Sequence, residues 1–283
     1  VGLAMFFISV NLPYLAVFSM IAGLYHLVNH AIFKGLLFLC AGSVYKATGP
    51  RNIEKLGGLI KKMPQTAVYF LIGAMAISAL PPLNGFVSEW LTLQAFFLGA
   101  FNVAGGTKLF FGICAAMLAL TSGLAAACFV KAFGITFLAQ PRSHYAQDVK
   151  EVPLSMKAGM FFLALLTVIF GLLAAVIIKL LAGVAQAATG IDISSMSFSL
   201  NSYTISPQID RGIYLSSPLL ALVLAVLGIA GFIVYKLFGK EKIRSYRTWD
   251  CGYYKLDSRN EYTATAFSKP FRIAFSFFLL PYR

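Results

Sequence analysis

Long apolar runs separated by short polar stretches dominate this chain. Five of them have the length and composition of helices that cross a bilayer, which takes about 20 apolar residues. They cover about residues 13–46, 64–101, 107–139, 154–187 and 215–239. Pro81 and Pro82 interrupt the second run, because two missing N–H groups open the helical hydrogen-bond ladder. The pattern predicts an all-α fold: a polytopic transmembrane helix bundle with about five full spanning helices, one of them broken.

A further apolar run, residues 1–10, makes only about 15 Å of helix, half the thickness of the hydrocarbon core. No basic segment precedes it, so it does not have the pattern of a signal peptide. We expect it to be a truncated first helix, and the chain to be the C-terminal part of a longer protein.

The composition excludes a soluble domain. Hydrophobic residues make up 59% of the 283 residues and charged residues 12%, about half the charged fraction of soluble domains. The 26 Phe and 24 Gly residues suit lipid-facing surfaces and close helix packing. With a mean hydropathy of +0.80, we expect an integral membrane protein in the lipid bilayer of a bacterial or archaeal cell membrane.

Basic residues are distributed unevenly between the polar stretches. Of the 23 Lys and Arg residues, 18 fall in loop 46–63, in loop 140–157 and in the C-terminal tail, and only Lys108 and Arg211 fall in the stretches between them. Because cytoplasmic loops are enriched in Lys and Arg, both loops and the C-terminus are expected in the cytoplasm, and segment 188–214 outside. This topology explains the net charge of +13, so no nucleic-acid partner is expected.

Three ionisable residues, His26, His30 and Lys34, recur at every fourth position of an apolar run and share one helical face with Asn29. Histidine rings pass protons through both nitrogens near neutral pH. A charge at membrane depth costs about 2.5–3.5 kcal/mol on insertion scales, so such groups are functional by default. The pattern favours a proton-relay line. The alternative is two core histidines that bond across helices, with Lys34 reaching toward the membrane surface.

Glu89 is the only acidic residue in any of the apolar runs. It follows the break at Pro81 and Pro82, and opened backbone is tolerated in a membrane only where it is buried in protein or lines water. Asn84 and Gly85 would make the restart of the helix flexible. A helix start stabilises a negative charge and apolar surroundings oppose it, so a carboxylate balanced between the two suits proton relay. A structural salt bridge to another helix is the alternative.

Lys131 lies near the end of its apolar run. It either takes part in the relay at the cytoplasmic mouth or only extends to the membrane surface. The four cysteines contain no CxxC pair, so neither a metal nor an iron–sulfur cluster nor another cofactor is expected. A zinc site at His26 and His30 would need further ligands, which the neighbouring positions do not supply.

Several motifs occur in the same order in a known protein family. They are YHLVNHAIFKGLLFL at 25–39, GS at 42–43, LGGL at 56–59, MP at 63–64 and SALPPLNGFVSEW at 78–90. Over about residues 1–140 the chain thereby resembles the antiporter-like proton-conducting subunits of respiratory complex I, Mrp-type sodium/proton antiporters and membrane-bound nickel–iron hydrogenases. The tail motifs TWDCGY at 248–253 and YTATAFSKP at 262–270 are similar to the hydrogenase-4 and formate hydrogenlyase branch.

The resemblance implies an organisation in three parts. Residues 1–140 would belong to the second of two inverted five-helix repeats of the channel domain, with the first helix truncated. Residues 141–239 would add two transmembrane helices with the outward loop 188–214, and residues 240–283 would form a cytoplasmic tail.

The resemblance also implies roles for single residues. Lys34 and its histidines would be the relay on the helix before the broken one. Glu89 would be the terminal acid on the broken helix, where other members of the family have a lysine. The acid and lysine of the first repeat would precede Val1, so this piece alone is not expected to pump.

The expected function is that of a proton-translocating membrane subunit of a redox-driven complex, either hydrogenase-4/formate hydrogenlyase-like or NADH–quinone oxidoreductase-like. Such subunits have no catalytic or redox centre of their own, so other membrane subunits would be the partners. One alternative is a subunit of an Mrp-type antiporter, which would also carry sodium. Another is a structural membrane anchor of a redox complex. The tail motifs favour a redox complex over an antiporter, and the cost of burying Lys34 and Glu89 disfavours a mere anchor.

Overall fold

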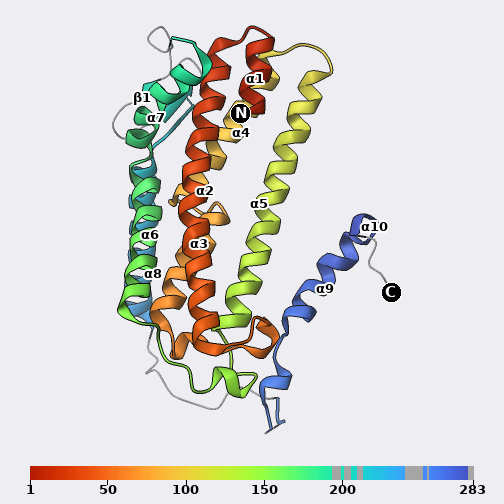
Figure 1. Cartoon of the computed structure of the whole chain (residues 1–283), viewed down its shortest axis with the longest axis vertical. Coiled ribbons are helices and arrows are strands. Elements are labelled where there is room, and N and C mark those ends of the chain that lie inside the picture. The colour runs from red at the N-terminus through yellow and green to blue at the C-terminus, as the bar shows by residue number, and fades with distance from the viewer. Residues whose placement is uncertain (193–198, 201–204, 209–212, 240–250, 254, 280–283) are drawn as a thin grey trace.

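Helix α2 (Pro13–Thr48) is the central element of this computed structural model, and five other helices pack against it (Figure 1). They are α1 (Gly2–Ser9), α3 (Pro64–Ile77), α4 (Asn84–Asn102), α6 (Leu154–Leu172) and α7 (Ala174–Thr189). The structure describes every residue except 193–198, 201–204, 209–212, 240–250, 254 and 280–283. Proline occupies the first turn of α2 and α3, where its missing N–H leaves no intrahelical bond unmade.

The other helices lie around this centre. Helix α5 (Thr107–Phe137) packs against α3 and α4, and α8 (Ser217–Phe238) packs against α6. In the tail, α9 (Ala264–Ala274) contacts α5 and is followed by α10 (Ser276–Leu279). Short 3-10 turns in the loops and tail are η1 (Ile53–Lys55), η2 (Leu59–Lys61), η3 (His144–Ala146) and η5 (Ser258–Asn260). The first three residues of the tail motif at 248–253 lie outside the described residues.

A small antiparallel sheet follows α7, in the order β1-β2-β3. Its strands are β1 (Ser199–Leu200), β2 (Ile205–Gln208) and β3 (Ile213–Leu215). Leu200 pairs with Ile205, and Ile205 pairs with Leu215, so β2 is the middle strand. Apart from this sheet, the described elements are helical, and the predicted all-α bundle with one broken helix is confirmed.

The apolar run 154–187 is divided into two helices, α6 and α7, where one uninterrupted helix was expected. The division falls at Leu173, where the carbonyl oxygen of Phe170 accepts a 2.5 Å hydrogen bond from the Tyr25 hydroxyl instead of a helical one. A Cβ atom on Gly171 would lie 2.4 Å from the carbonyl oxygen of Pro82. The point where α6 and α7 are divided therefore packs against the break between α3 and α4. The hydropathy of the sequence does not predict this contact.

The polar stretches separate to the two ends of the bundle. Loops 46–63 and 140–157 and the tail around η5 meet at one end, and the sheet lies at the opposite end (Figure 1). Arg142 joins the three basic regions, because its guanidinium donates a 3.0 Å hydrogen bond to the Leu56 carbonyl oxygen and forms a 3.2 Å ion pair with Glu261. This grouping agrees with the distribution of Lys and Arg, while the assignment of this end to the cytoplasm stays a prediction.

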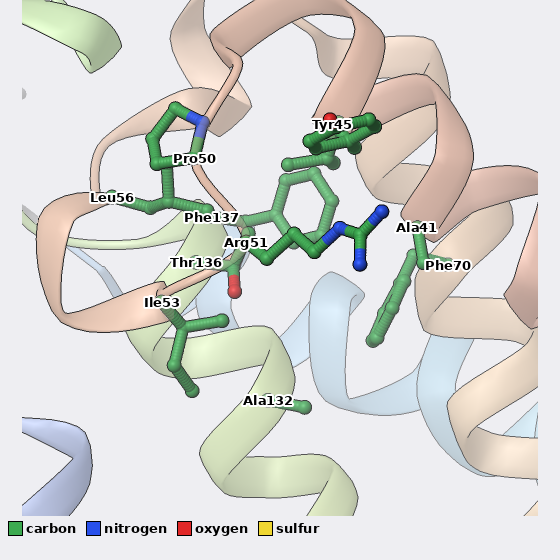
Figure 2. A pocket seen from close by; sticks show the side chains of 11 residues that line it. Ala41, Tyr45, Pro50, Arg51, Ile53, Leu56, Phe70, Ala132, Thr136 and Phe137 are labelled. Atoms are coloured by element: carbon green, nitrogen blue, oxygen red, sulfur yellow. The ribbon is translucent and has the colours of Figure 1, made fainter.

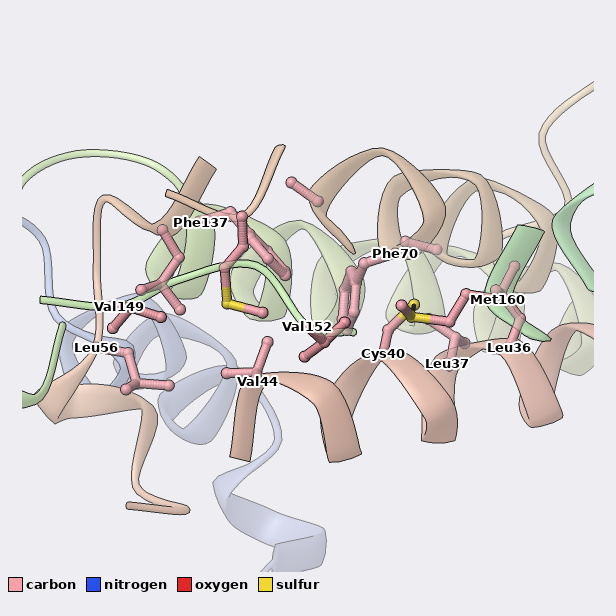
Figure 3. Close-up of a cluster of buried hydrophobic side chains, with 14 of the residues drawn as sticks. Leu36, Leu37, Cys40, Val44, Leu56, Phe70, Phe137, Val149, Val152 and Met160 are labelled. Carbon is pink, nitrogen blue, oxygen red and sulfur yellow. Dashed lines mark hydrogen bonds between the residues drawn. The ribbon is translucent and has the colours of Figure 1, made fainter. Parts of the chain in front are cut away.

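Two hydrophobic clusters divide α2 along its length. The larger one joins residues 36–44 of α2 to α3, to the end of α5 and to α6 (Figure 3). Its buried members include Leu36, Leu37, Cys40, Val44, Leu56, Phe137 and Met160. A second cluster joins residues 17–25 of α2 to α4 and α7. The polar positions of α2, residues 26–34, therefore lie between two apolar clusters.

Four of the described helices, α2, α5, α6 and α8, are long and apolar enough to cross a membrane, and α3 and α7 are shorter apolar helices. The most apolar stretches of α5 and α8 are only 6% buried. Most side chains of these two stretches therefore lie on the outer surface of the described bundle. The protein is membrane-embedded, and the expected number of spans stays a prediction.

Candidate functional site

The break between α3 and α4 is a tight turn in which freed backbone groups find partners. Ala79 adopts a φ of +52°, the left-handed conformation that commonly ends a helix. The Leu80 amide donates to the Met75 carbonyl oxygen at 3.0 Å, and the Leu83 amide donates to the Leu80 carbonyl oxygen at 3.1 Å. Helix α4 then begins at Asn84, so a new helix start lies inside the bundle.

Two glycines allow this turn to pack closely. A Cβ atom on Gly85 would lie 1.8 Å from the carbonyl oxygen of Ala76, and one on Gly171 would lie 2.4 Å from that of Pro82. Any side chain would force these backbones apart. Gly85 does not have a positive φ. The structure gives Gly85 a steric role, and its predicted flexibility at the restart of the helix stays a prediction.

Asn29 and Asn84 form a reciprocal pair that fixes α4 against α2. Asn84 Nδ2 donates to Asn29 Oδ1 at 3.1 Å, and Asn29 Nδ2 donates to the Asn84 carbonyl oxygen at 3.3 Å. Both side chains are completely buried. The pair satisfies both side-chain polar atoms of Asn29 and the side-chain amide of Asn84, whereas Asn84 Oδ1 has no hydrogen-bond partner among the described residues, and it places the start of α4 beside the polar face of α2.

His26 contacts α4 one residue before Glu89. Its Nδ1 lies 3.1 Å from Ser88 Oγ, which itself donates a 2.9 Å hydrogen bond to the Gly85 carbonyl oxygen. A hydroxyl has a single proton, so with this arrangement Nδ1 carries a proton and donates to Ser88. The ring centre of His30 lies 5.8 Å from that of His26, and His30 is exposed on the surface of the described bundle.

Glu89 is half-buried between α4 and α5, where its carboxylate accepts a short hydrogen bond from Ser122. Ser122 Oγ also lies 3.0 Å from the Leu118 carbonyl oxygen. The hydroxyl can donate to an ionised Glu89, or accept from a protonated one while donating to Leu118. It therefore serves both protonation states of the acid. Among the described residues Glu89 has no ion pair, so the alternative of a structural salt bridge finds no partner there.

Lys34 opens onto a cavity of about 210 Å³ between α2, α3 and α5. A second cavity, of about 330 Å³, shares Ala41 and Phe70 with the first and extends to Arg51 at the loop end of the bundle (Figure 2). Arg51 projects between Tyr45 and Phe70 in Figure 2, and its guanidinium carbon lies 5.1 Å from the Tyr45 ring centre. The two adjoining cavities place Lys34 within reach of this end of the protein.

Lys131 has a partner that neither interpretation of the sequence anticipated. Its Nζ donates a 2.6 Å hydrogen bond to Ser268 Oγ on the tail helix α9. The ammonium group is thereby held between α5 and α9 instead of extending freely along the membrane surface.

The predicted relay residues are only partly brought together. His26, His30 and Lys34 occupy neighbouring turns of α2, and His26 contacts Ser88 of α4, the residue before Glu89. Within the described part of the chain, no hydrogen bond or ion pair joins Glu89 directly to Lys34 or Lys131. A group of three or more His, Cys, Asp or Glu side chains that could hold a metal is also absent from those residues.

Sequence reasoning missed Ser122 as the partner of Glu89. A signal was present, since Thr121 and Ser122 are adjacent hydroxyl residues in the otherwise apolar run 107–139. The contact between Ser88 and His26 was not predicted either.

Known proteins share both the sequence and the fold. Residues 3–119 match the family described as NADH:quinone oxidoreductase/Mrp antiporter, TM. Hydrogenase-4 component B of Escherichia coli (strain K12) is 38% identical over 280 residues, covering 98% of this chain and 41% of that protein. Formate hydrogenlyase subunit 3 of the same strain is 35% identical over 272 residues, covering 95% of this chain and 41% of that protein.

A solved archaeal membrane-bound sulfane sulfur reductase contains a chain of the same fold, with a TM-score of 0.75 and 24% identity over 97% of this chain and 44% of the other. The chain thus spans about two fifths of the length of the curated relatives it matches. The family match contains the break, Glu89 and the polar face of α2, and both Escherichia coli relatives match through the tail as well. Residues 3–119 of the chain thus belong to the NADH:quinone oxidoreductase/Mrp antiporter transmembrane family, and over nearly its whole length the chain is similar to hydrogenase-4 component B and formate hydrogenlyase subunit 3.

Proposed function

We propose that this chain is part of a proton-translocating membrane subunit of a redox-driven complex of the hydrogenase-4 or formate hydrogenlyase type. The extent of the likeness supports this type, because the alignment with the two hydrogenase relatives includes the tail, whereas the family match shared with Mrp antiporters ends at residue 119. The redox reaction takes place in partner subunits of this complex. Their coupling to proton movement is electrostatic and runs along the buried charges.

One observation carries the proposal: the environment of Glu89. A carboxyl group within a membrane span is costly and marks an ion pathway by default. Its hydrogen-bond partner Ser122 can serve the acid in both protonation states, as a relay requires. Helix α4 starts inside the bundle five positions before Glu89, so the acid lies shortly after the helix break.

The polar face of α2 supplies the rest of the path. His26 reaches α4 through Ser88, and His30 and Lys34 follow at one-turn intervals toward the loop end. Each imidazole can accept a proton on one nitrogen and release one from the other. The neighbouring cavities at Lys34 and at Arg51, which share Ala41 and Phe70 in their walls, support an opening of this line at the end that we assign to the cytoplasm.

The test uses the full-length protein in its complex. Glu89→Gln keeps the hydrogen-bonding shape but cannot ionise, and Lys34→Ala removes the ammonium group. We expect both variants to assemble and to lose proton translocation, measured with a pH-sensitive dye in proteoliposomes while the redox reaction is driven. Lys108→Ala, which removes a lysine from the opposite end of the bundle, is the matched control and should translocate normally. Normal translocation by both site variants would refute the assignment.

Sodium transport of the Mrp type is the second candidate, since the family match includes Mrp antiporters. The same proteoliposomes distinguish it if uptake of radioactive sodium is measured beside the pH signal. Sodium uptake that depends on Glu89, with no proton signal in sodium-free buffer, would replace the proton proposal. A structural anchor predicts that neither ion flux changes in the Glu89 and Lys34 variants.

A further inference from the structure

The tail helix α9 is attached to the rest of the bundle by two carboxylates. Glu54 Oε1, from the loop between α2 and α3, accepts from the Thr265 amide at 2.7 Å and from the Thr265 hydroxyl at 2.6 Å. Glu261, just before α9, accepts from the Gln140 amide at 2.8 Å and forms an ion pair with Arg142 at 3.2 Å. Hydrogen bonds and an ion pair therefore join the tail to both basic loops, 46–63 and 140–157.

Glu54 occupies the place where a helix start binds a negative charge best. Helix α9 begins at Ala264, and Thr263 Oγ1 accepts from the Ala266 amide at 3.2 Å, which caps one free N–H group. The Glu54 carboxylate takes another, the amide of Thr265. The hydrogen bonds from Thr265 and nearby backbone amides hold the pKa of Glu54 below its ordinary value, so Glu54 is ionised at neutral pH. The charge of Glu54 therefore fixes where α9 lies and how α9 is rotated about its own axis.

In this position and rotation of α9, Ser268 faces Lys131 on α5. Ser268 Oγ donates a 2.9 Å hydrogen bond to the Ala264 carbonyl oxygen one turn earlier, so its lone pairs face away from α9. Lys131 Nζ donates to it at 2.6 Å. Beside this contact lies a cavity of about 210 Å³ between α5 and α9, lined on α5 by Cys128 and on α9 by Phe267 and Phe271.

We propose that Ser268 is a positioning residue for Lys131, and that Glu54 holds α9 in the register that makes this contact. The proposal rests on the proposed function, in which Lys131 belongs to the proton relay. A lysine side chain near a membrane surface samples many rotamers. One charge-assisted hydrogen bond to a fixed hydroxyl selects the rotamer that keeps the ammonium group between α5 and α9. The tail is then a working part of the relay and not only a surface extension.

The first experiment measures docking of α9 without any transport assay. Cys128 lies under α9, so a second cysteine, Phe271→Cys, is introduced in full-length protein in which the other native cysteines of this chain are replaced. A short bis-maleimide should then cross-link α5 to α9 in the assembled complex. Glu54→Ala should reduce the cross-linked fraction several-fold, and Glu54→Gln, which keeps an acceptor for Thr265, should reduce it less. Asp148→Ala removes an acid from the neighbouring loop and should leave the yield unchanged.

The second experiment measures the effect on the relay. We expect Ser268→Ala to slow redox-driven proton translocation on the order of tenfold, the typical effect of losing one hydrogen bond to a charged group. Ser268→Thr retains the hydroxyl and should restore most of the rate. The double variant Ser268→Ala with Lys131→Ala should be no slower than Lys131→Ala alone, because Ser268 acts only through Lys131.

These outcomes separate this proposal from the proposed function. If Glu89→Gln abolishes translocation while Ser268→Ala and Lys131→Ala are both normal, the positioning role is refuted and the relay at Glu89 stands. If no site variant alters translocation, the proposed function fails, and the cross-linking result still decides whether Glu54 docks α9. Equal cross-linking in wild type and Glu54→Ala would refute the role of Glu54.

Discussion

At the scale of single residues, Gly85 is fixed by the approach of two backbones. The end of α3 passes so close to the start of α4 that a Cβ atom on Gly85 would lie 1.8 Å from the Ala76 carbonyl oxygen. Since the neighbouring atom belongs to the backbone, it cannot move aside as the end of a flexible side chain would. The geometry at Glu89 therefore depends on a residue with no chemistry of its own.

We predict that Gly85→Ala destabilises the protein strongly. Overpacking typically costs about 1–3 kcal/mol, and a clash with backbone lies at or above the top of this range. Gly112→Ala on α5 is the matched control, because a Cβ atom there meets nothing within 4 Å, and it should be neutral or slightly stabilising. Thermal unfolding of the purified complex in detergent gives the measurement. Equal melting temperatures for the two variants would contradict the steric reason.

At the scale of elements, α3 depends on a carboxylate from another part of the chain. Its N-cap residue, Met63, provides no side-chain hydrogen bond. Glu151 instead accepts from the Gln65 amide at 3.0 Å, the Thr66 amide at 3.3 Å and the Thr66 hydroxyl at 2.6 Å. The first half of the broken helix is thus capped by the loop before α6, which ties the break to the packing of α6.

Removal of this cap is a prediction about one helix. Glu151→Ala should destabilise the protein by about 1 kcal/mol, the usual value for an N-cap, and lower its melting temperature by roughly 2–4 °C. Glu151→Asp should lose less, because a carboxylate remains near the same amides. Lys150→Ala changes the exposed neighbouring residue and serves as the control. A Glu151→Ala protein that melts with the wild type would show that α3 needs no cap from this loop.

The two helix interruptions also belong to the scale of elements. The division between α6 and α7 and the break between α3 and α4 face each other, with Gly171 against the Pro82 carbonyl oxygen. Pro81 and Pro82 made the break between α3 and α4 visible in the sequence. The division between α6 and α7 contains no proline and depends on the contact with the α3–α4 turn and on the hydroxyl of Tyr25. The sequence could therefore reveal the break between α3 and α4 through its prolines, but not the division between α6 and α7.

At the scale of the whole molecule, three segments far apart in the sequence are joined at one end. Arg142 donates to the carbonyl oxygens of Leu56 and Ile135 and pairs with Glu261. Glu54 extends this junction to α9. The end that holds the basic loops 46–63 and 140–157 is thus also the end where the tail is fixed to the bundle.

The charge of Glu54 makes docking of the tail depend on pH. Its pKa in the folded protein lies below the ordinary 4.5, chiefly through the hydrogen bond from the Thr265 side chain. A lowered pKa means that its stabilising contribution is fully present above the unfolded value and is lost as the pH falls through the folded one. We therefore predict docked α9 from pH 8 down to about pH 5, and progressive release below pH 4.5.

A spin label on Cys128 reports this release as increased mobility in an acid titration. In the Glu54→Gln variant the part of the transition due to Glu54 should disappear. Arg142 and Glu261 face the same junction, and their ion pair is left in place in that variant, so only the difference between the two titration curves is assigned to Glu54. An identical titration curve in both proteins would mean that Glu54 does not control docking.

By itself, the sequence determined the membrane setting, the broken helix, the family and the candidate relay residues. These follow from properties that are local along the chain: apolar length, the two missing N–H groups at Pro81 and Pro82, and the rarity of an acid such as Glu89 in a span.

Only the tertiary structure decided which groups meet. Ser122 reaches Glu89, Ser268 reaches Lys131 and Glu54 reaches Thr265 across 33, 137 and 211 positions of sequence. Such contacts depend on the rotation and axial register of packed helices, which are set by side-chain fit over whole interfaces and leave no local pattern.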